Sequence, residues 1–373
     1  MRTHRTGAEM PFTPDQPYND LPFLPPSAQI ETVITLKHAI TASRAVAELK
    51  GAGERIPNQN LLIRAIVLQE ARLSSEIENI VTTNDDLYRA LSEEDSKWNP
   101  QVKEVMWYQY ALWHGYSELQ RRPLSPSLFV EIASNIRQHD TGLRTMPGTR
   151  IANQRGEIIY TPPSGKDQIL ALLNNLCDFI HADDGLDPLI KLAVIHYQFE
   201  AIHPFSDGNG RTGRILNVLY LVQAGLLTLP VLYLSGYIIG SKSEYYRGLR
   251  MVTEEAAWEA WVVYILTAIE TTAKDTCKRI DDIRKLMDHT LEHIRQHHPK
   301  LPANELVDLI FQQPYTRISM LAEAGIAHRQ TASEYLNKLE SIGVLTGTRV
   351  GKDKLFVNTP LFDVLIRPLA NRE

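Results

Sequence analysis

This chain of 373 residues has only two cysteines, Cys177 and Cys277. Two cysteines cannot build a disulfide framework, and their separation lacks the spacing of a metal site. Such sparing use of cysteine fits a reducing compartment, so we expect a cytoplasmic protein. A chain of this length can bury a sizeable hydrophobic core without disulfide bonds. At about 150 residues per domain, its length suggests two or three domains.

The chain also lacks a strong excess of either charge. It has 39 basic and 44 acidic side chains, which gives a net charge of −5. This balance argues against a general nucleic-acid binder, although it leaves room for a local basic patch. Hydrophobic residues at 43% and charged residues at 22% exclude a disordered or fibrous chain. The first ten residues are polar and carry no apolar signal core.

The apolar stretch over residues 215–239 is a poor candidate for a membrane span. A spanning helix needs about 20 largely apolar residues, but this stretch contains Asn217, Gln223 and Pro230. The pattern instead predicts a buried helix to about residue 224, followed by a turn and a second element. We therefore expect no membrane partner.

Prolines are concentrated in residues 11–27, which predicts an extended N-terminal arm. Most of the chain after this arm has the apolar spacing of helices. The ranges with this spacing are 28–50, 59–80, 101–121, 125–138, 167–182, 188–202 and 255–298, the last as one or two long helices. The β-prone run 157–161, bounded by Gly156 and Pro162, instead predicts one arm of a hairpin.

The pattern changes after Pro302. Three short helices are predicted at 304–312, 318–324 and 330–342, followed by two apolar runs at 344–345 and 355–357. Three helices followed by a hairpin resemble a winged helix, which usually contacts DNA through its third helix.

The charges of this C-terminal region do not favour DNA binding. Residues 301–373 hold eight basic and eight acidic side chains, whereas DNA affinity depends mainly on neutralising phosphates. Arg349, Lys352 and Lys354 could still form a local basic wing. We favour a role in protein interaction or dimerisation over DNA binding.

The segment HPFSDGNGRTGR, residues 203–214, concentrates side chains that suit phosphate chemistry. His203 could accept a proton from an attacking hydroxyl, because the pKa of histidine lies near neutrality. Asp207 offers a hard oxygen ligand for Mg²⁺. Gly208 and Gly210 let the backbone turn tightly and approach a ligand closely.

The rest of the segment suits a bound phosphate. The N–H groups of residues 208–211 would face a phosphate at the start of the helix that follows. Asn209 can donate to a phosphate oxygen. Arg211 and Arg214 are three residues apart, so both guanidinium groups can project to one side of that helix.

Residues 203–214 resemble the signature of the Fic-domain family, HPFx(D/E)GNGRxxR, and every signature position is met. The resemblance extends over the helices around it, roughly 125–270. It implies a mainly α fold, with a Fic-type helical core and a β-hairpin flap over the nucleotide site. It also implies a protein adenylyltransferase that moves AMP from ATP to a Ser, Thr or Tyr hydroxyl and releases pyrophosphate.

The resemblance gives the motif residues their roles. His203 would be the general base, and Asp207 would hold Mg²⁺ against the α- and β-phosphates. The turn over residues 208–210, with the Asn209 side chain, would form the anion hole for the α-phosphate.

Further roles concern the rest of the nucleotide and the target. Arg211 and Arg214 would engage the β- and γ-phosphates, and Tyr246 would lie against the adenosine. A structural role as a core aromatic stays open for Tyr246 and its neighbour Tyr245. The flap would pair as an edge strand with the target segment. Its residues are Ile158, Ile159 and Tyr160.

The segment SSEIEN, residues 74–79, matches the family's inhibitory pattern (S/T)xxxE(G/N) through Ser74, Glu78 and Asn79. By this resemblance the Glu78 carboxylate pairs with Arg214 and takes the charge and space that the γ-phosphate of ATP needs. ATP would then bind with its α-phosphate poorly aligned for attack, and small misplacements slow a reaction greatly. We therefore predict that Glu78 holds the enzyme in a low-activity state.

Other functions stay open at this point. The same site could remove AMP from a protein, or the chain could be a DNA-binding regulator that senses a nucleotide without turnover. A structural or toxin–antitoxin scaffold is a third alternative. The expected partners are ATP and a target hydroxyl, and self-modification and a homodimer stay open.

We predict four regions along the chain. Residues 1–124 form the N-terminal arm and the helical region with the inhibitory motif. Residues 125–270 form the Fic catalytic domain, and a connecting helix over 271–300 leads to the winged-helix-like domain, 301–373.

Overall fold

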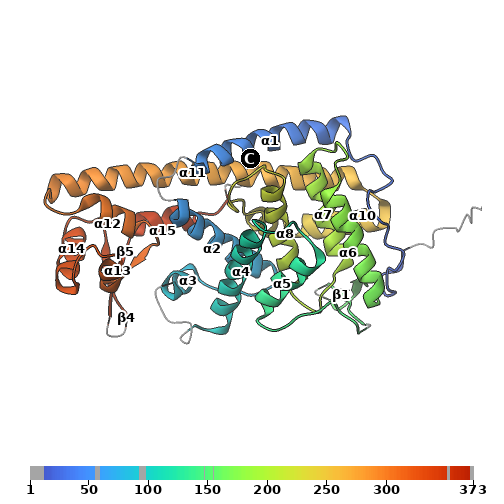
Figure 1. Ribbon diagram of the computed structural model, residues 1–373, viewed down its shortest axis with the longest axis horizontal. Coiled ribbons are helices and arrows are strands. Elements are labelled where there is room, and N and C mark those ends of the chain that lie inside the picture. The colour runs from blue at the N-terminus through green and yellow to red at the C-terminus, as the bar shows by residue number, and fades with distance from the viewer. Residues whose placement is uncertain are drawn as a thin grey trace, which may run out of the picture.

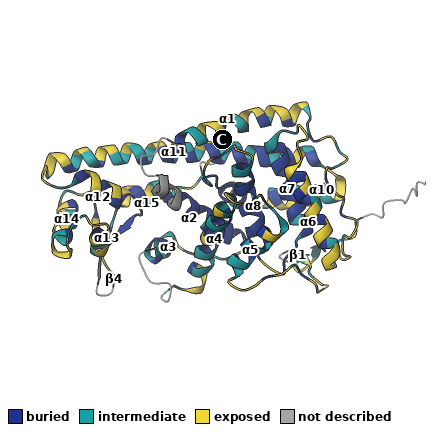
Figure 2. Cartoon of the chain, in the orientation of Figure 1, coloured by how far each residue is buried: buried dark blue, intermediate teal, exposed yellow. Residues whose placement is uncertain are grey.

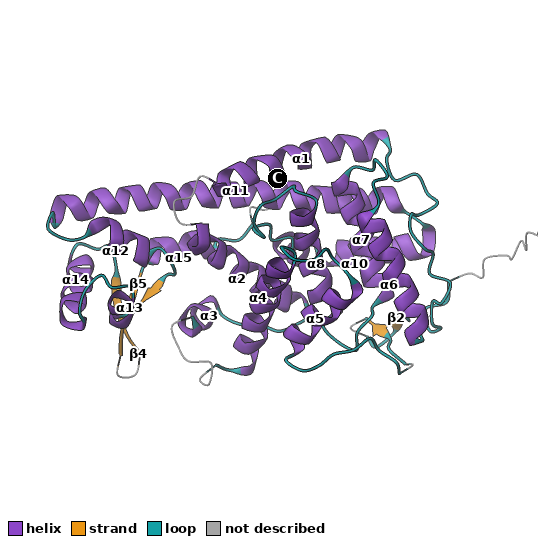
Figure 3. Ribbon diagram, in the orientation of Figure 1, coloured by secondary structure: helices purple, strands orange, loops and turns teal. Residues whose placement is uncertain are grey.

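The computed structural model describes residues 12–54, 59–91, 98–146, 148–153, 155–350 and 353–369. The fold is mainly helical, as predicted, and strands occur in two small antiparallel sheets (Figure 3). Residues 1–10, Pro11 of the arm and Lys352 of the predicted wing lie outside the described residues.

The N-terminal helices follow the predicted ranges except for the short helix at 84–90, which was not predicted. They are α1 (Val33–Glu54), α2 (Gln59–Ile77), α3 (Asn84–Ala90) and α4 (Pro100–Glu118). Helix α1 starts later than predicted and continues through Gly51 and Gly53. Asn99 caps α4 by accepting the N–H of Val102 at 2.8 Å, and Pro100 occupies the first helical turn, where it has no N–H to satisfy.

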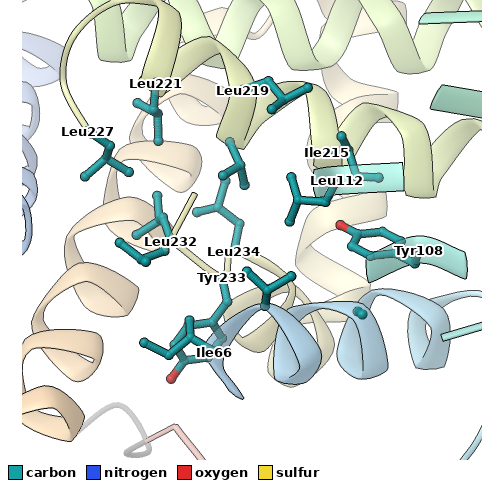
Figure 4. Close-up of a cluster of buried hydrophobic side chains, with 14 of the residues drawn as sticks. Ile66, Tyr108, Leu112, Ile215, Leu219, Leu221, Leu227, Leu232, Tyr233 and Leu234 are labelled. Carbon is teal, nitrogen blue, oxygen red and sulfur yellow. The ribbon is translucent and has the colours of Figure 1, made fainter. Parts of the chain in front are cut away.

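The central body consists of helices that surround a buried pair, α7 and α8. The helices are α5 (Pro126–Arg137), α6 (Lys166–His181), α7 (Pro188–Ile202), α8 (Asn209–Gln223), α9 (Ser235–Gly240) and α10 (Lys242–Glu255). Almost every residue of α7 is buried, so it runs through the core rather than along the surface (Figure 2). Part of this core lies between α4 and α8, where Leu112, Ile215 and Leu219 are fully or almost fully buried (Figure 4).

A single helix of 40 residues, α11 (Trp258–His297), joins this body to the C-terminal region (Figure 1). Helix α1 lies alongside it. The Trp261 indole N–H donates to the carbonyl of Ala193 at 2.8 Å, which ties α11 to the buried α7. Because α11 is continuous, the predicted boundary at residue 270 falls inside a helix.

The C-terminal module has the predicted three helices and hairpin, together with elements the sequence did not reveal. Its elements are α12 (Ala303–Ile310), β3 (Tyr315–Thr316), α13 (Ile318–Glu323), α14 (Arg329–Ser341), β4 (Thr346–Val350), β5 (Asp353–Val357) and α15 (Thr359–Ile366). The strands pair in the order β3-β5-β4. The prediction of a strand at 344–345 was wrong, because β4 begins at Thr346 and the ladder continues into the predicted turn. The Lys354 ammonium contacts Glu340, so one cation of the predicted wing is already neutralised.

The module packs against the N-terminal helices and α11. Tyr315 stacks on Tyr88 of α3 at 6.5 Å between ring centroids. The guanidinium of Arg279, on α11, donates to the carbonyls of Val364 and Leu365 at 2.9 Å each and pairs with Asp275 at 2.5 Å. Arg279 is 5% exposed, so these bonds form in a largely dry contact.

We expect Arg279→Met to lower the free energy of unfolding by about 3 kcal/mol, because the change leaves a buried carboxylate and carbonyl groups without their cation. Urea unfolding followed by circular dichroism would measure the loss. Lys278→Met, an exposed neighbour on the same helix, is the control and should unfold like wild type. Equal stability of the two variants would show that the contact contributes little.

None of the helices in the described ranges combines the length and apolar character that a bilayer crossing requires. The apolar stretch 215–239 is divided between α8, a turn and α9. The predicted buried helix and second element are therefore confirmed.

Candidate active site

His203 lies in the turn between the two buried helices, directly after α7 ends at Ile202. Its backbone is left-handed, with φ at 48°, and its N–H donates to the Phe199 carbonyl at 3.0 Å. Burial and the nearby positive charge of Arg144 lower the pKa of His203 to about 4. The imidazole is therefore neutral at physiological pH and able to accept a proton.

Arg144 holds this turn in place, and no sequence pattern had pointed to this residue. It is 7% exposed, and its guanidinium donates to the carbonyl of His203 at 2.7 Å and to that of Ile202 at 3.2 Å. Its backbone N–H donates to the Pro204 carbonyl at 3.0 Å. A buried arginine bonded only to main-chain carbonyls has no sequence signature, because any residue can supply a carbonyl.

The glycine turn that follows has the shape of an anion-binding site. Gly208 has φ at 79°, a conformation that favours glycine, and it precedes the first residue of α8. The Asn209 amide accepts the N–H of Phe205 and donates to its carbonyl, both at 2.8 Å. The Asn209 side chain thus shapes the turn and is not among the cavity-lining residues. The first N–H groups of α8 have no acceptor within the helix, which is the property that lets a helix start bind phosphate.

Asp207 lies at the outer side of the turn with its side chain half exposed. One carboxylate oxygen accepts the N–H of Gly208 at 2.6 Å, and the other contacts the guanidinium of Arg137 at the end of α5. Asp207 is thus a hard oxygen donor beside an anion-binding turn. This position fits Mg²⁺, which usually takes one or two carboxylates and completes its shell with phosphate oxygens and water.

Arg214 of α8 is hydrogen-bonded to the predicted inhibitory segment, residues 74–79. Its guanidinium donates to the Ser74 hydroxyl at 2.7 Å, to the Ser74 carbonyl at 3.0 Å and to the Glu78 carboxylate at 2.9 Å. A Cβ placed on Gly210 would clash with the Glu78 carboxylate. Glu78 therefore lies directly over the glycine turn, in space that a phosphate would otherwise take.

The end of α2 explains why an asparagine follows the glutamate. Asn79 has φ at 64°, which asparagine tolerates better than most residues. The N–H of Ile80 donates to the carbonyl of Ser75 at 3.0 Å, and the N–H of Asn79 donates to that of Glu76 at 3.0 Å. This helix-terminating turn brings the chain around so that Glu78 can reach Arg214.

A cavity of about 570 Å³ opens beside these residues. Its lining includes Glu78, His203, Gly210 and Arg214 from the sites above. The flap contributes Arg150, Ile151, Asn153, Ile159 and Tyr160, and α10 contributes Tyr245, Tyr246, Arg247, Leu249, Arg250 and Thr253. The inhibitory helix, the motif and the flap thus meet at one cavity.

The two tyrosines differ in their surroundings, and so do the two motif arginines. Tyr246 is 39% exposed at the cavity, whereas Tyr245 is buried with its hydroxyl 2.9 Å from the His196 imidazole. Arg211 is 2% exposed and pairs with Glu104 of α4 at 2.5 Å. Arg211 does not line the cavity, so of the two motif arginines only Arg214 faces it.

Glu200 is a second carboxylate that the sequence patterns did not single out. It lines the cavity one turn before His203, and one of its buried oxygens has no hydrogen-bond partner among the described residues. Burial raises its pKa to about 7, against the opposing effect of Arg214. Because it carries only part of a charge near neutrality, Glu200 competes weakly for Arg214.

The predicted flap is confirmed as a hairpin of β1 (Ile151–Ala152) and β2 (Ile158–Tyr160). The Tyr160 hydroxyl donates to the carbonyl of Ala201 at 2.7 Å, which fixes the flap over α7. The N-terminal arm packs against it, since the N–H of Tyr18 donates to the Thr161 carbonyl at 2.9 Å. Phe12 of the arm stacks on Tyr160 with ring centroids 5.8 Å apart and lines the cavity.

The solved structures confirm the fold. A Fic family protein from Desulfovibrio desulfuricans G20 matches with a TM-score of 0.59 and 18% identity, over 89% of this chain and 98% of that one. A Fic domain containing signaling protein from Bacteroides thetaiotaomicron matches with a TM-score of 0.52 and 19% identity, over 65% and 97% of the two chains. At these identities the likeness concerns the fold alone.

Two curated relatives are named protein adenylyltransferases. Fic-1 of Caenorhabditis elegans is 32% identical over 96 residues, which is 25% of this chain and 17% of that protein. A probable protein adenylyltransferase of Aquifex aeolicus is 29% identical over 167 residues, 43% of this chain and 49% of that one. The chain thus spans at most about half the length of these relatives.

Three family models match in sequence order. Residues 36–117 match the Fic/DOC family N-terminal model, and residues 123–221 match the Fic/DOC family model. Residues 286–361 match the C-terminal domain of SoFic-like protein adenylyltransferases. These matches cover α2, the motif with its flap and the winged-helix-like module, so the chain contains Fic/DOC family domains.

Proposed function

We propose that this protein is an adenylyltransferase that transfers AMP from ATP to a Ser, Thr or Tyr hydroxyl of a protein, and that Glu78 restrains it. The observation that carries the proposal is the meeting of a neutral His203, the glycine turn and Arg214 at one cavity under an open-edged flap. The names of the curated relatives support it.

The chemistry follows from the positions of these groups. The neutral imidazole of His203 accepts the proton of the target hydroxyl, and the hydroxyl oxygen attacks the α-phosphorus. The bond from that phosphorus to the β-phosphate oxygen breaks, and pyrophosphate leaves. The N–H groups at the start of α8 stabilise the negative charge that develops on the α-phosphate.

Mg²⁺ fits this site, with Asp207 as the protein ligand. A bound Mg²⁺ would neutralise phosphate charge and orient the leaving group. The Asp207 carboxylate must release the guanidinium of Arg137 before it can serve as a ligand. Arg214 supplies a second cation for the terminal phosphates once Glu78 has moved away.

The four predicted regions follow from the same assignment. Residues 1–124 carry the restraint, 125–270 the catalytic core, 271–300 the connection and 301–373 the winged-helix-like module. We place the protein in the cytoplasm, where ATP and reduced thiols prevail. For the module, the neutral net charge supports protein contact over DNA binding.

The label position in ATP tests the reaction. The Glu78→Gly protein is incubated with a cell lysate and ATP labelled at either the α- or the γ-phosphate. We expect label on protein from the α-position and none from the γ-position. Label from the γ-position alone would indicate phosphate transfer, and release of AMP from an AMP-modified protein without any labelling would indicate hydrolytic removal of AMP.

A further inference from the structure

Two arginines at the cavity have no part in the proposed chemistry. Arg150, just before β1, and Arg247, on α10, both line the cavity and are both exposed. Neither has a hydrogen-bond or ion-pair partner among the residues the structure describes. Arg214 and Arg250, which also line the cavity, are paired with Glu78 and with Glu254 at 2.9 and 2.8 Å.

The cavity mouth therefore carries uncompensated positive charge. Its lining holds four arginines against two carboxylates, Glu78 and Glu200. Glu78 is already engaged by Arg214, and Glu200 lies deep, beside Gly213 of α8. No carboxylate of the lining is left to neutralise Arg150 or Arg247. An unpaired guanidinium on a cavity rim is suited to bind a carboxylate or a phosphate through two parallel hydrogen bonds.

The location of these arginines favours a target side chain over the nucleotide. Arg150 adjoins Ile151, which pairs across the hairpin with Tyr160 of β2. The other edge of β2 has no strand partner among the described residues, so a target segment can pair there. The phosphates of ATP belong at the glycine turn, at Gly210 and the start of α8, which neither arginine contacts through a hydrogen bond or ion pair among the described residues.

We infer that Arg150 and Arg247 recognise acidic side chains that flank the modified hydroxyl, so that the targets are acidic extended segments. This inference rests on the proposed function, since it names the substrate class of that same site. Charges on the rim of a binding site mainly steer encounter and select among partners. The two arginines thus set specificity, while His203 and the glycine turn perform the reaction.

Two fluorescent peptides test this inference by binding, independently of transfer. Each has one threonine; it is flanked by aspartates in one peptide and by asparagines in the other. Fluorescence anisotropy measures their affinity for the full-length Glu78→Gly protein. We expect the aspartate peptide to bind up to about fivefold more tightly for each arginine, and the preference to fall with added salt.

Arg150→Gln and Arg247→Gln, each in the Glu78→Gly background, should reduce this preference and together abolish it. Arg155→Gln is the matched control, because Arg155 lies in the turn of the same hairpin, is exposed and does not line the cavity. It should keep the full preference. ATP affinity, measured by calorimetry, should stay within about twofold in every variant, as expected for groups that do not contact the nucleotide.

Equal affinity for the two peptides would overturn the inference. So would a loss of ATP affinity in the two variants with the peptide preference unchanged, because the arginines would then serve the nucleotide. AMP transfer to the peptides is measured separately. A clear aspartate preference without transfer to any protein would contradict the proposed function and leave the acidic recognition standing.

Discussion

The Glu78→Gly, His203→Ala double variant is expected to transfer AMP about 10³-fold more slowly than Glu78→Gly alone, the usual effect of removing a positioned general base. Without the imidazole, no neutral group at this position can take the hydroxyl proton. The measurement is the initial rate of α-label transfer to protein. The Glu78→Gly background keeps the reference rate high enough to measure a large decrease.

The double variant should still bind ATP, because His203 contributes a proton acceptor and the glycine turn binds the phosphates. Calorimetric titration with ATP provides this control. A rate that stays within a few-fold of the parent would show that another group accepts the proton, and Glu200, with its pKa near 7, would be the first to examine.

The pH profile follows from the pKa of His203, which burial and Arg144 lower to about 4. Since the neutral form is the base, a lowered pKa keeps His203 active down to lower pH. An imidazole with the ordinary pKa of about 6.5 would lose about tenfold in rate between pH 7.5 and 5.5. We expect no such fall over this range in the Glu78→Gly protein.

The second large effect concerns Glu78, which we propose slows AMP transfer. Glu78→Gly is expected to raise AMP transfer by about 10²-fold, because an α-phosphate displaced by a fraction of an ångström reacts far more slowly. The Glu78 carboxylate pairs with Arg214 and lies over Gly210, so its removal frees both the cation and the space for the γ-phosphate. Wild type and variant are compared with ATP labelled at the α-phosphate.

Glu76→Gly is the matched control for this change. Glu76 lies in the last turn of the same helix and pairs with Arg72 at 2.8 Å, away from the cavity. The substitution loosens the end of α2, because it removes the ion pair with Arg72 and places a glycine inside the helix, but it leaves Glu78 in place, so transfer should stay at the wild-type level. Similar activation by both variants would assign the effect to loosening of α2 rather than to the carboxylate.

Local sequence patterns account for most of the helices and for the site's core. The motif at 203–214 predicted the histidine, the glycine turn and the start of a buried helix, because these depend on residues adjacent in the chain. The pattern at 74–79 predicted the partner of Arg214, although the pair is separated by 136 positions in sequence. In that case the resemblance to a family supplied the long-range information that periodicity cannot.

Some elements could not be predicted from the sequence because their stability comes from partners that are distant along the chain. Strand β3 is two residues long and exists because β5 pairs with it. Helix α15 is held in place by the Arg279 guanidinium of α11, which donates hydrogen bonds to two of its backbone carbonyls. The N-terminal arm was predicted as extended, but its contact with the flap through Phe12 and Tyr160 depends on tertiary packing. Short segments of this kind have too few local contacts to leave a pattern.

The mainly helical class and the candidate roles of His203, the glycine turn and Glu78 could be predicted from the chain alone, since each prediction depends on residue type at a fixed local spacing. The packing of distant helices was needed to show that Arg214 lines the cavity whereas Arg211 pairs with Glu104 outside it. The two arginines are chemically identical and three residues apart. Packing of α8 against α2 and α4 turns one guanidinium toward the cavity and the other away from it.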